Sequence, residues 1–447
     1  MKRFAALLVA FCIAAVLAMP AAAVGYDPSA VYTVQAESAY VVNTDTNIII
    51  YEKNSEQQVQ AHSLTQLMTV ALVLANYGDA LDTTTVTQPQ AISDYVLGTD
   101  DHADVRIGET LTLRQALYAI MLRNANEVTM TTAYCLSGGD LTGWVSQMNS
   151  FSQRIGTTGS VWTDACGIDS GNVTTARDMY LILRYLMSFD VFVEIAGAYN
   201  YTMPANTRHA SPYDIQNYNK MISKSAGGKF YREAVRGGKT DVSGYVQDAG
   251  TQSLVSWATQ NGETYIFCVM NSPDTCDAYG YATRRPALYE TSQLLDWVYS
   301  SFSIQPALDT DEPLCEVKVK YSLDTDTLML YPADSLMTIL PSTSDSTVTQ
   351  KRFNLPDAVY APVRQGDVVG SVTLLLAGEE IGTVDLLAGQ DVERNTVLFT
   401  VAKLQEFFGS LYFRVVVVLS VLALAAYLVW FAVHAVREQK SKRIRRR

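Results

Sequence analysis

A serine at the head of a predicted helix is the first residue whose type and position suggest chemistry. Ser63 precedes apolar residues at helical spacing, including Leu64, Leu67 and Met68. A serine hydroxyl is a weak nucleophile that needs an adjacent base, and a lysine three positions later would lie one helical turn away. Gln66 holds that position, its amide is not basic, and no lysine in the chain has a serine three residues before it. Ser63 is therefore either a nucleophile whose base comes from elsewhere or an N-cap for the helix that begins at Leu64.

Two other polar segments contain side chains that could take part in such chemistry. The first is the pair Asn124 and Asn126, and the second is Lys239-Thr240-Asp241, which precedes a predicted hairpin. A lysine removed from water can be neutral near pH 7, so Lys239 is an amine that could take the serine's proton. The alternative is structural, with Asn126 as a hydrogen-bonded buried amide and Lys239 and Thr240 as ordinary strand residues.

Histidine and cysteine form no pattern that is typical of a metal site. The four histidines are scattered along the chain: His62, His102, His209 and His434. The six cysteines lack C-x-x-C spacing, so we predict neither a metal nor a cofactor. Cys268 and Cys276 could form a disulfide, but the pattern favours buried free thiols.

The elements that must position these residues form a mixed, α+β pattern. Residues 39–51 and 245–270 are each predicted to form a hairpin, the second with a Gln-Asn-Gly turn. Between them, helical spacing predicts helices over residues 63–76, 111–136 and 175–189. Hairpins at both ends of a helical segment predict one antiparallel sheet that both ends build and helices flank.

A second domain is predicted after a boundary rich in Asp, Thr and Pro at residues 306–313. Residues 315–398 contain short runs that alternate apolar and polar residues, separated by turn residues. This pattern predicts a small all-β sandwich domain, and residues 401–413 are predicted to form a short helix beyond it.

These segments together resemble the low-molecular-weight penicillin-binding proteins, the serine-type D-alanyl-D-alanine carboxypeptidases of peptidase family S11. The family's active-site segment, A-S-x-T-K-x-M-T, is similar to residues 61–69 of this chain. Further similar segments follow in the family's order, at residues 148–149, 166–168, 174–179, 238–240 and 361–370. The resemblance implies a beta-lactamase/transpeptidase-like first domain and a sandwich-type second domain.

The resemblance also assigns catalytic positions to four polar residues. Ser63 stands at the nucleophile position and Gln66 at the position of the catalytic lysine. Asn124 and Asn126 stand for the family's S-x-N motif, with Asn124 in place of the serine that relays a proton. Two of the groups that move protons in the family are therefore replaced by amides.

Substrate binding is assigned by the same resemblance to the segment that stands for the K-T-G motif, Lys239, Thr240 and Asp241. The resemblance implies a peptidoglycan stem peptide or a beta-lactam as the ligand of the predicted cleft. Asp241 in place of glycine adds a negative charge near the expected position of the ligand's carboxylate, where it would oppose binding.

Apolar segments at both ends predict how the chain is placed in the cell. Lys2 and Arg3, an apolar run and three alanines predict a signal peptide over residues 1–23. Residues 415–436 lack Asp, Glu, Lys and Arg and are long enough to cross a bilayer, and the basic tail 437–447 follows them. We expect a single-pass cell-membrane protein with its bulk on the cell-wall side and a cytoplasmic C-terminus. Its predicted parts between these ends are the carboxypeptidase-like domain 24–305, the β-sandwich 306–400 and the juxtamembrane segment 401–414.

Charge limits the possible partners. The formal net charge is −12, and basic residues gather at the two ends, so the segment between them is more acidic still. Such a surface repels phosphate backbones, which excludes nucleic acid as an expected partner. The membrane, through the C-terminal helix, remains an expected partner.

Two functions of different class stay open. The first is a serine carboxypeptidase that removes the terminal D-alanine of peptidoglycan stem peptides through an acyl-enzyme. The second is a non-catalytic peptidoglycan-binding or scaffolding protein that keeps the family's fold. Gln66 at the lysine position favours the second.

Overall fold

A computed structural model of the chain describes residues 28–96, 98, 101–241, 251–273, 285–342, 349–376 and 379–444. The described residues fall into two units. The first runs to Gln305 and includes the later strand β15 (Met337–Pro341), and the second comprises Pro306–Leu336, Thr349–Leu376 and the chain from Glu380 onward. The predicted signal peptide and Cys276 lie outside the described residues.

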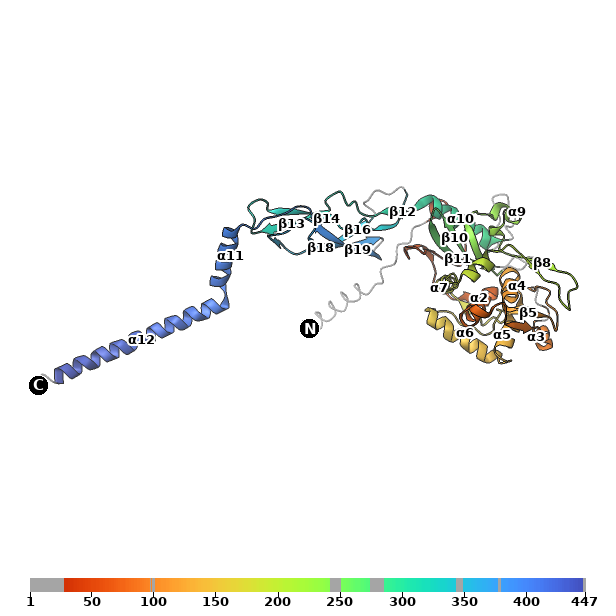
Figure 1. Cartoon of the computed structure of the whole chain (residues 1–447), viewed down its shortest axis with the longest axis horizontal. Helices are drawn as coiled ribbons and strands as arrows, with labels where there is room; N and C mark the ends of the chain where they lie inside the picture. The colour runs from red at the N-terminus through yellow and green to blue at the C-terminus, as the bar shows by residue number, and fades with distance from the viewer. Residues whose placement is uncertain are drawn as a thin grey trace, which may run out of the picture. The chain divides into compact units, whose positions relative to one another are not determined.

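The first unit is built around a five-stranded antiparallel sheet in the order β2-β1-β11-β10-β9. Figure 1 labels β10 and β11 of this sheet. Its strands are β1 (Ser38–Asn43), β2 (Ile49–Lys53), β9 (Val235–Thr240), β10 (Thr251–Gln260) and β11 (Glu263–Pro273). The first and last hairpins meet at the centre, where Ser38 pairs with Met270 and Asn43 with Tyr265. The predicted sheet built from both ends of the domain is confirmed.

Short strand pairs and helices complete the unit. The pairs are β3 (Val59–Gln60) with β6 (Val173–Thr174), β4 (Thr85–Thr87) with β5 (Thr110–Thr112), β7 (Asn200–Met203) with β8 (Tyr213–Gln216), and β12 (Phe302–Pro306) with β15. The α-helices are α2 (Gln66–Tyr77), α3 (Gln90–Tyr95), α4 (Leu113–Arg123), α5 (Asn126–Leu136), α6 (Leu141–Ile155), α7 (Ala176–Leu186), α8 (Asp190–Gly197), α9 (Lys224–Gly227) and α10 (Pro286–Ser301). Single 3₁₀ turns are η1 (Pro28–Ala30), η2 (His62–Thr65), η3 (Gly78–Ala80), η4 (Lys220–Ile222) and η5 (Gly228–Phe230).

Alternation along the strands divides the interior into two apolar clusters, one on each face of the sheet. In β1, Tyr40 and Val42 join the cluster that contains α2 and α7, whereas Ala39 and Val41 join the cluster that contains α10. Successive side chains of a strand point to opposite faces, so a strand buried on both faces is apolar throughout. Helices therefore cover both faces of the sheet.

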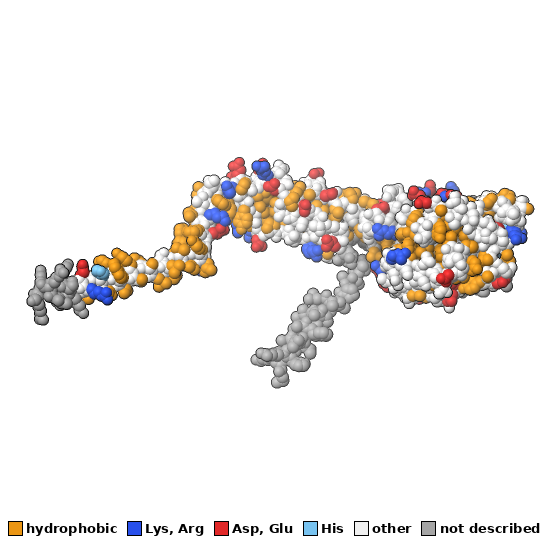
Figure 2. All heavy atoms as spheres, turned by 60° about the horizontal axis from the view of Figure 1, so that its bottom comes forward, with side chains coloured by type: hydrophobic (Ala, Val, Ile, Leu, Met, Phe, Trp, Pro, Cys, Tyr) orange, Lys and Arg blue, Asp and Glu red, His pale blue; other side chains and the backbone are white. Residues whose placement is uncertain are grey.

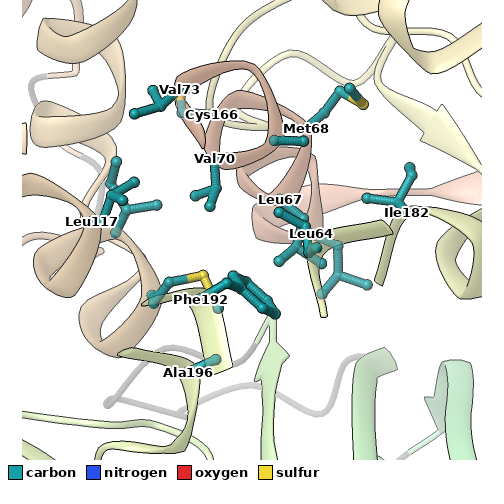
Figure 3. Close-up of a cluster of buried hydrophobic side chains, with 14 of the residues drawn as sticks. Leu64, Leu67, Met68, Val70, Val73, Leu117, Cys166, Ile182, Phe192 and Ala196 are labelled. Atoms are coloured by element: carbon teal, nitrogen blue, oxygen red, sulfur yellow. The ribbon is translucent and has the colours of Figure 1, made fainter. Parts of the chain in front are cut away.

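Helix α2 lies inside the first of these clusters (Figure 3). Every residue from Gln66 to Leu74 is buried, and the helix packs against α4, α6 and α7. Figure 3 shows Leu64, Leu67 and Val70 facing Leu117 and Phe192 from neighbouring helices. A helix that is apolar on most sides is stable only when it is buried in this way.

One predicted helix is wrong. Residues 111–136 form two helices, α4 and α5, because the chain turns at Asn124 and Ala125. Asn124 adopts left-handed backbone angles (φ 54°, ψ 30°), which asparagine tolerates better than most residues, and Ala125 is also non-helical, with a ψ of 98°. The break turns the polar residues between the helices toward α2 and β9.

The second unit is β-rich, as predicted, and its strands follow the order β16-β18-β19-β14-β13-β17. They are β13 (Cys315–Lys320), β14 (Thr327–Pro332), β16 (Thr349–Asn354), β17 (Val359–Tyr360), β18 (Val368–Leu376) and β19 (Glu379–Ala388). Residues such as Leu328, Leu330 and Leu386 are fully buried and form its own apolar cluster. The unit therefore has an independent core.

Two helices end the described chain, α11 (Thr396–Gly409) and α12 (Leu411–Ile444). Residues Leu411–Glu438 are long and apolar enough to cross a membrane and are not buried by the protein. Figure 2 shows apolar side chains along the visible face of α12. This helix is a candidate membrane span, as the sequence predicts. The predicted short helix before it forms, but it begins earlier, at Thr396.

Candidate active site

The turn that carries Ser63 is held by a distant segment of the chain. His62 has a left-handed φ of 44°, and a Cβ atom on Gly167 would lie 1.8 Å from the carbonyl oxygen of His62. Only glycine allows this approach, and Gly167 itself has a φ of 93°. The backbone on both sides of the contact is thus fixed, and with it the direction in which Ser63 projects.

Ser63 does not cap a helix. It lies within the turn η2, and neither Ala61 nor Thr65, the residues that precede η2 and α2, makes a side-chain capping bond. The Ser63 hydroxyl instead donates to Asp101 Oδ2 at 3.3 Å, and its residue is 8% exposed. The capping alternative is therefore wrong, and the hydroxyl faces a carboxylate.

Gln66 lies one turn after Ser63 and is fully buried. Its Nε2 donates to the Asn124 carbonyl oxygen at 2.9 Å and to Asn126 Oδ1 at 3.0 Å. These two bonds use both amide protons, so Gln66 fastens α2 to the turn between α4 and α5. An amide at this point fills the space and joins the network, but it accepts no proton from Ser63.

Asn124 connects the turn to strand β9. Its Nδ2 donates to the Thr240 carbonyl oxygen at 3.0 Å, and its Oδ1 accepts from Lys239 Nζ at 2.8 Å. The left-handed conformation of Asn124 directs this side chain toward the strand. Because Gln66 binds its carbonyl oxygen, Asn124 links all three predicted motifs.

Lys239 is buried, with 1% exposure, and donates to two neutral oxygens in the described structure. Its Nζ lies 2.7 Å from the Ile120 carbonyl oxygen and 2.8 Å from Asn124 Oδ1. Burial lowers the pKa of Lys239 to about 7, and the charges of Asp101 and Asp241 oppose this shift. The amine is therefore neutral in a large fraction of molecules near pH 7.

Thr240 and Asp241 are tied to the neighbouring strand β10. Thr240 Oγ1 donates to the Ser253 carbonyl oxygen at 3.0 Å, and Asp241 Oδ1 accepts from Ser253 N at 2.7 Å. Burial raises the pKa of Asp241 to about 7, against the effect of these backbone bonds. Asp241 therefore carries only part of a negative charge at neutral pH, and its carboxyl group also holds the end of β9.

Asp101 is a site residue that the sequence did not predict. It is far from the three motifs in sequence, and no local pattern marks it. Its carbonyl oxygen accepts from Asn126 N at 3.0 Å, and Glu127 Oε1 accepts from Ala103 N at 2.7 Å. Two residues at the start of α5 thus fix the loop that brings the Asp101 carboxylate to Ser63.

The structure brings the predicted site residues into one polar cluster, defined by Ser63, Gln66, Asn124, Asn126, Lys239, Thr240 and Asp241, with Asp101 beside Ser63.

Among the described residues, no group of three or more His, Cys, Asp or Glu side chains could hold a metal. His209 is buried near the Asp104 carbonyl oxygen, 2.8 Å away, and Glu109. Within the described part of the chain the cysteines are free thiols, of which Cys166 and Cys268 are buried.

The chemistry available to this cluster follows from its donors and acceptors. It contains a serine hydroxyl, a buried amine with a lowered pKa and a carboxylate on the hydroxyl. Gln66, one turn after the serine, is an amide, and the Lys239 amine is bonded to oxygens of other residues. Serine-based acyl transfer requires a base that reaches the hydroxyl; Asp101 contacts the Ser63 hydroxyl, and Lys239 is the amine of the cluster.

Comparison with known proteins identifies the family. Residues 25–274 match the D-alanyl-D-alanine carboxypeptidase family, peptidase S11, and residues 302–394 match the C-terminal domain of penicillin-binding protein 5. The D-alanyl-D-alanine carboxypeptidase DacF of Bacillus subtilis is 23% identical over 80% of this chain and 86% of its own length.

Solved structures share the fold. The D-alanyl-D-alanine carboxypeptidase DacD of Francisella tularensis superposes with a TM-score of 0.59 and 17% identity, over 81% of this chain and 95% of that one. Penicillin-binding protein 5 of Haemophilus influenzae gives a TM-score of 0.56 and 22% identity, over 83% of this chain and all of that one. The chain therefore belongs to the D-alanyl-D-alanine carboxypeptidase family, the low-molecular-weight penicillin-binding proteins.

Proposed function

We propose that this chain is an exported, membrane-anchored protein of the cell wall that binds peptidoglycan stem peptides at the Ser63 site and does not hydrolyse them efficiently. Family membership supports the ligand class, since the relatives named above are D-alanyl-D-alanine carboxypeptidases. The apolar helix α12 supports membrane anchoring. The signal peptide and the cytoplasmic tail remain predictions from the sequence.

The observation that carries the loss of hydrolysis is the bonding of Gln66. Its amide fills the position of the family's lysine, and both of its protons are held by Asn124 and Asn126. Removing a general base lowers a rate by roughly 10²–10⁴, and more when the base acts as a unit with the nucleophile. We therefore expect the stem peptide to bind without fast acylation of Ser63.

A specific observation favours a second candidate, an active carboxypeptidase that uses Lys239 as its base. Burial lowers the pKa of Lys239 to about 7, which is the range suited to a general base at neutral pH. Against this, Lys239 Nζ already donates to Ile120 and Asn124 and lies on the strand that stands for the substrate-binding motif. We rank this candidate second.

The test is acylation of Ser63 by a fluorescent penicillin, together with D-alanine release from an acyl-D-Ala-D-Ala peptide. The full-length chain purified in detergent should label slowly or not at all and release little D-alanine. Gln66→Lys alone should restore little, since Asn124 and Asp241 remain. Adding Asn124→Ser and Asp241→Gly should increase labelling more than the separate effects suggest, because residues that act as one unit are not additive.

Efficient labelling of the unaltered chain, abolished by Ser63→Ala, would overturn the proposal of a non-hydrolytic site. The variant Lys239→Met would then test the second candidate. If this variant is no longer labelled, Lys239 is the base. Topology is tested independently by adding protease outside intact cells. The protease should destroy both domains and leave a small C-terminal fragment, whereas protection of the residues before α12 would contradict the proposed orientation.

A further inference from the structure

Asp101 lies beside the hydroxyl group with which an incoming ligand would react. Its Oδ2 lies 3.3 Å from the Ser63 hydroxyl oxygen. A carbonyl group that reacts with serine must approach that oxygen to about 3–3.5 Å. Any ligand that reaches Ser63 therefore comes close to the Asp101 carboxylate.

The position of Asp101 is fixed by the fold. Its backbone carbonyl accepts from Asn126 N, the first residue of α5 and a member of the polar cluster. Two residues later, Ala103 N donates to the buried Glu127 side chain at 2.7 Å, and Val105 N donates to the same oxygen at 3.4 Å. The loop after Asp101 is thus held by a side chain of the helix that also holds Asn126.

Asp101 also acts on the other charges of the cluster. Among neighbouring charges it makes the largest opposing contribution to the lowered pKa of Lys239, and it raises the pKa of Asp241. Lys239, the amine that would bind a ligand carboxylate, already donates to Ile120 and Asn124, and the charge of Asp101 acts on it electrostatically. A free carboxylate entering this site meets one acidic residue beside Ser63 and another at the end of β9.

We propose that Asp101 determines the ligand selectivity of this site, disfavouring peptides that end in a free carboxylate and favouring the same peptides with an uncharged C-terminal amide. This inference rests on the proposed function, that the site binds stem peptides, and narrows it: those with a free terminal carboxylate bind, but more weakly than those with an amide. Repulsion between two carboxylates about 5 Å apart at an effective dielectric of about 20 corresponds to roughly a hundredfold in affinity, and solvent reduces it toward tenfold.

Binding of an acyl-D-Ala-D-Ala peptide and of its C-terminal amide to the full-length chain in detergent tests this. The unaltered protein should bind the amide about tenfold or more tightly than the acid, a measurement that needs no variant. Asp101→Asn, which keeps the size of the side chain, should bring the two affinities within about threefold by strengthening binding of the acid. Asp104→Asn is the matched control, since it removes an exposed charge from the same loop and should leave the ratio unchanged.

Each result decides a different point. Binding of both peptides with equal affinity, or an unchanged ratio in a folded Asp101→Asn protein, would overturn the role of Asp101 and leave the proposed function standing. Binding of neither peptide to any form would overturn the proposed function and this inference with it. Penicillin labelling adds a separate readout. A loss of slow labelling in Asp101→Asn would make Asp101 the base of Ser63 and overturn the selectivity role. Faster labelling of this variant by the anionic penicillin would support the selectivity role.

Discussion

Helix α2 contributes to two interiors that are stabilised in different ways. Leu67, Met68 and Val70 pack in the apolar cluster, whereas Gln66 joins the polar cluster. The apolar contacts have no required direction, and burial of area stabilises them. The polar contacts are directional, and each depends on a particular partner atom. The comparison shows that the polar cluster also contributes to the folded interior, because its amides and its amine make hydrogen bonds to other protein groups.

The largest expected effect is on the apolar side. Leu67→Ala should lower the free energy of unfolding by about 2–5 kcal/mol, since Leu67 is fully buried and a cavity would remain. Thermal unfolding followed by circular dichroism should show a decrease of several degrees. Leu404→Ala, on the exposed helix α11, is the control and should leave the transition of the first unit in place. If both substitutions lowered the unfolding temperature of the first unit equally, the buried leucine would not stabilise the fold more than the exposed one.

A smaller effect is expected when the link between the motifs is cut. Asn124→Gly should lower the free energy of unfolding by about 1–3 kcal/mol, because Lys239 loses an acceptor and the Thr240 carbonyl loses a donor. Glycine keeps the left-handed backbone at no steric cost, so this variant isolates the side chain. Asn124→Ala should cost about 1 kcal/mol more, through the left-handed conformation. A neutral Asn124→Gly would mean that the polar cluster does not stabilise the fold.

The smallest effect, taken per pH unit, concerns pH, to which the polar cluster responds and the apolar cluster does not. The pKa of Lys239 is about 7 in the folded protein and 10.5 in an unfolded chain. Between these values the unfolded chain binds more protons, so the free energy of unfolding should rise with pH, by up to about 1.4 kcal/mol per unit. Lys239→Met should remove this rise between pH 7 and 10.

The control for this prediction is Lys351→Met, which changes an exposed lysine of the second unit. Denaturant titrations of the three proteins across this pH range should show the difference for Lys239 alone. If the unaltered protein and Lys239→Met have parallel pH profiles, the amine is charged in the folded state and the polar cluster is more hydrated than its burial suggests.

Much of the fold was predictable because local patterns carry it. The apolar run in β1 and the turn at Asn261 and Gly262 mark the hairpins, and the turn residues have the positive φ values, 55° and 86°, that the sequence suggests. Helices α2 and α7 follow from apolar spacing, and Thr175 caps α7 by accepting from Asp178 N. Each of these features depends on residues close together in the sequence.

The site was less predictable because its details depend on contacts between distant residues. The break at Asn124 replaces a continuous helical pattern, and it is stabilised by Gln66 and Thr240. Asp101 has no sequence signal, because its position depends on Asn126 and on Glu127. The residue types of the motifs predict which side chains meet. The hydrogen-bond partners of these side chains determine which of them can still take part in a reaction.

The central pairing of β1 with β11 also has a consequence for the timing of synthesis. Thr44, just after β1, and Thr264, in β11, are 220 residues apart and joined by a hydrogen bond. At about 5–20 residues per second, β11 is made roughly 10–40 s after β1. All six residues of β1 are buried in the finished sheet, so until then this apolar strand has only β2 beside it and presents an open edge. The nascent chain therefore has to be kept from aggregating until Pro273 has been added, and a chain that stops before Glu263 cannot complete the sheet.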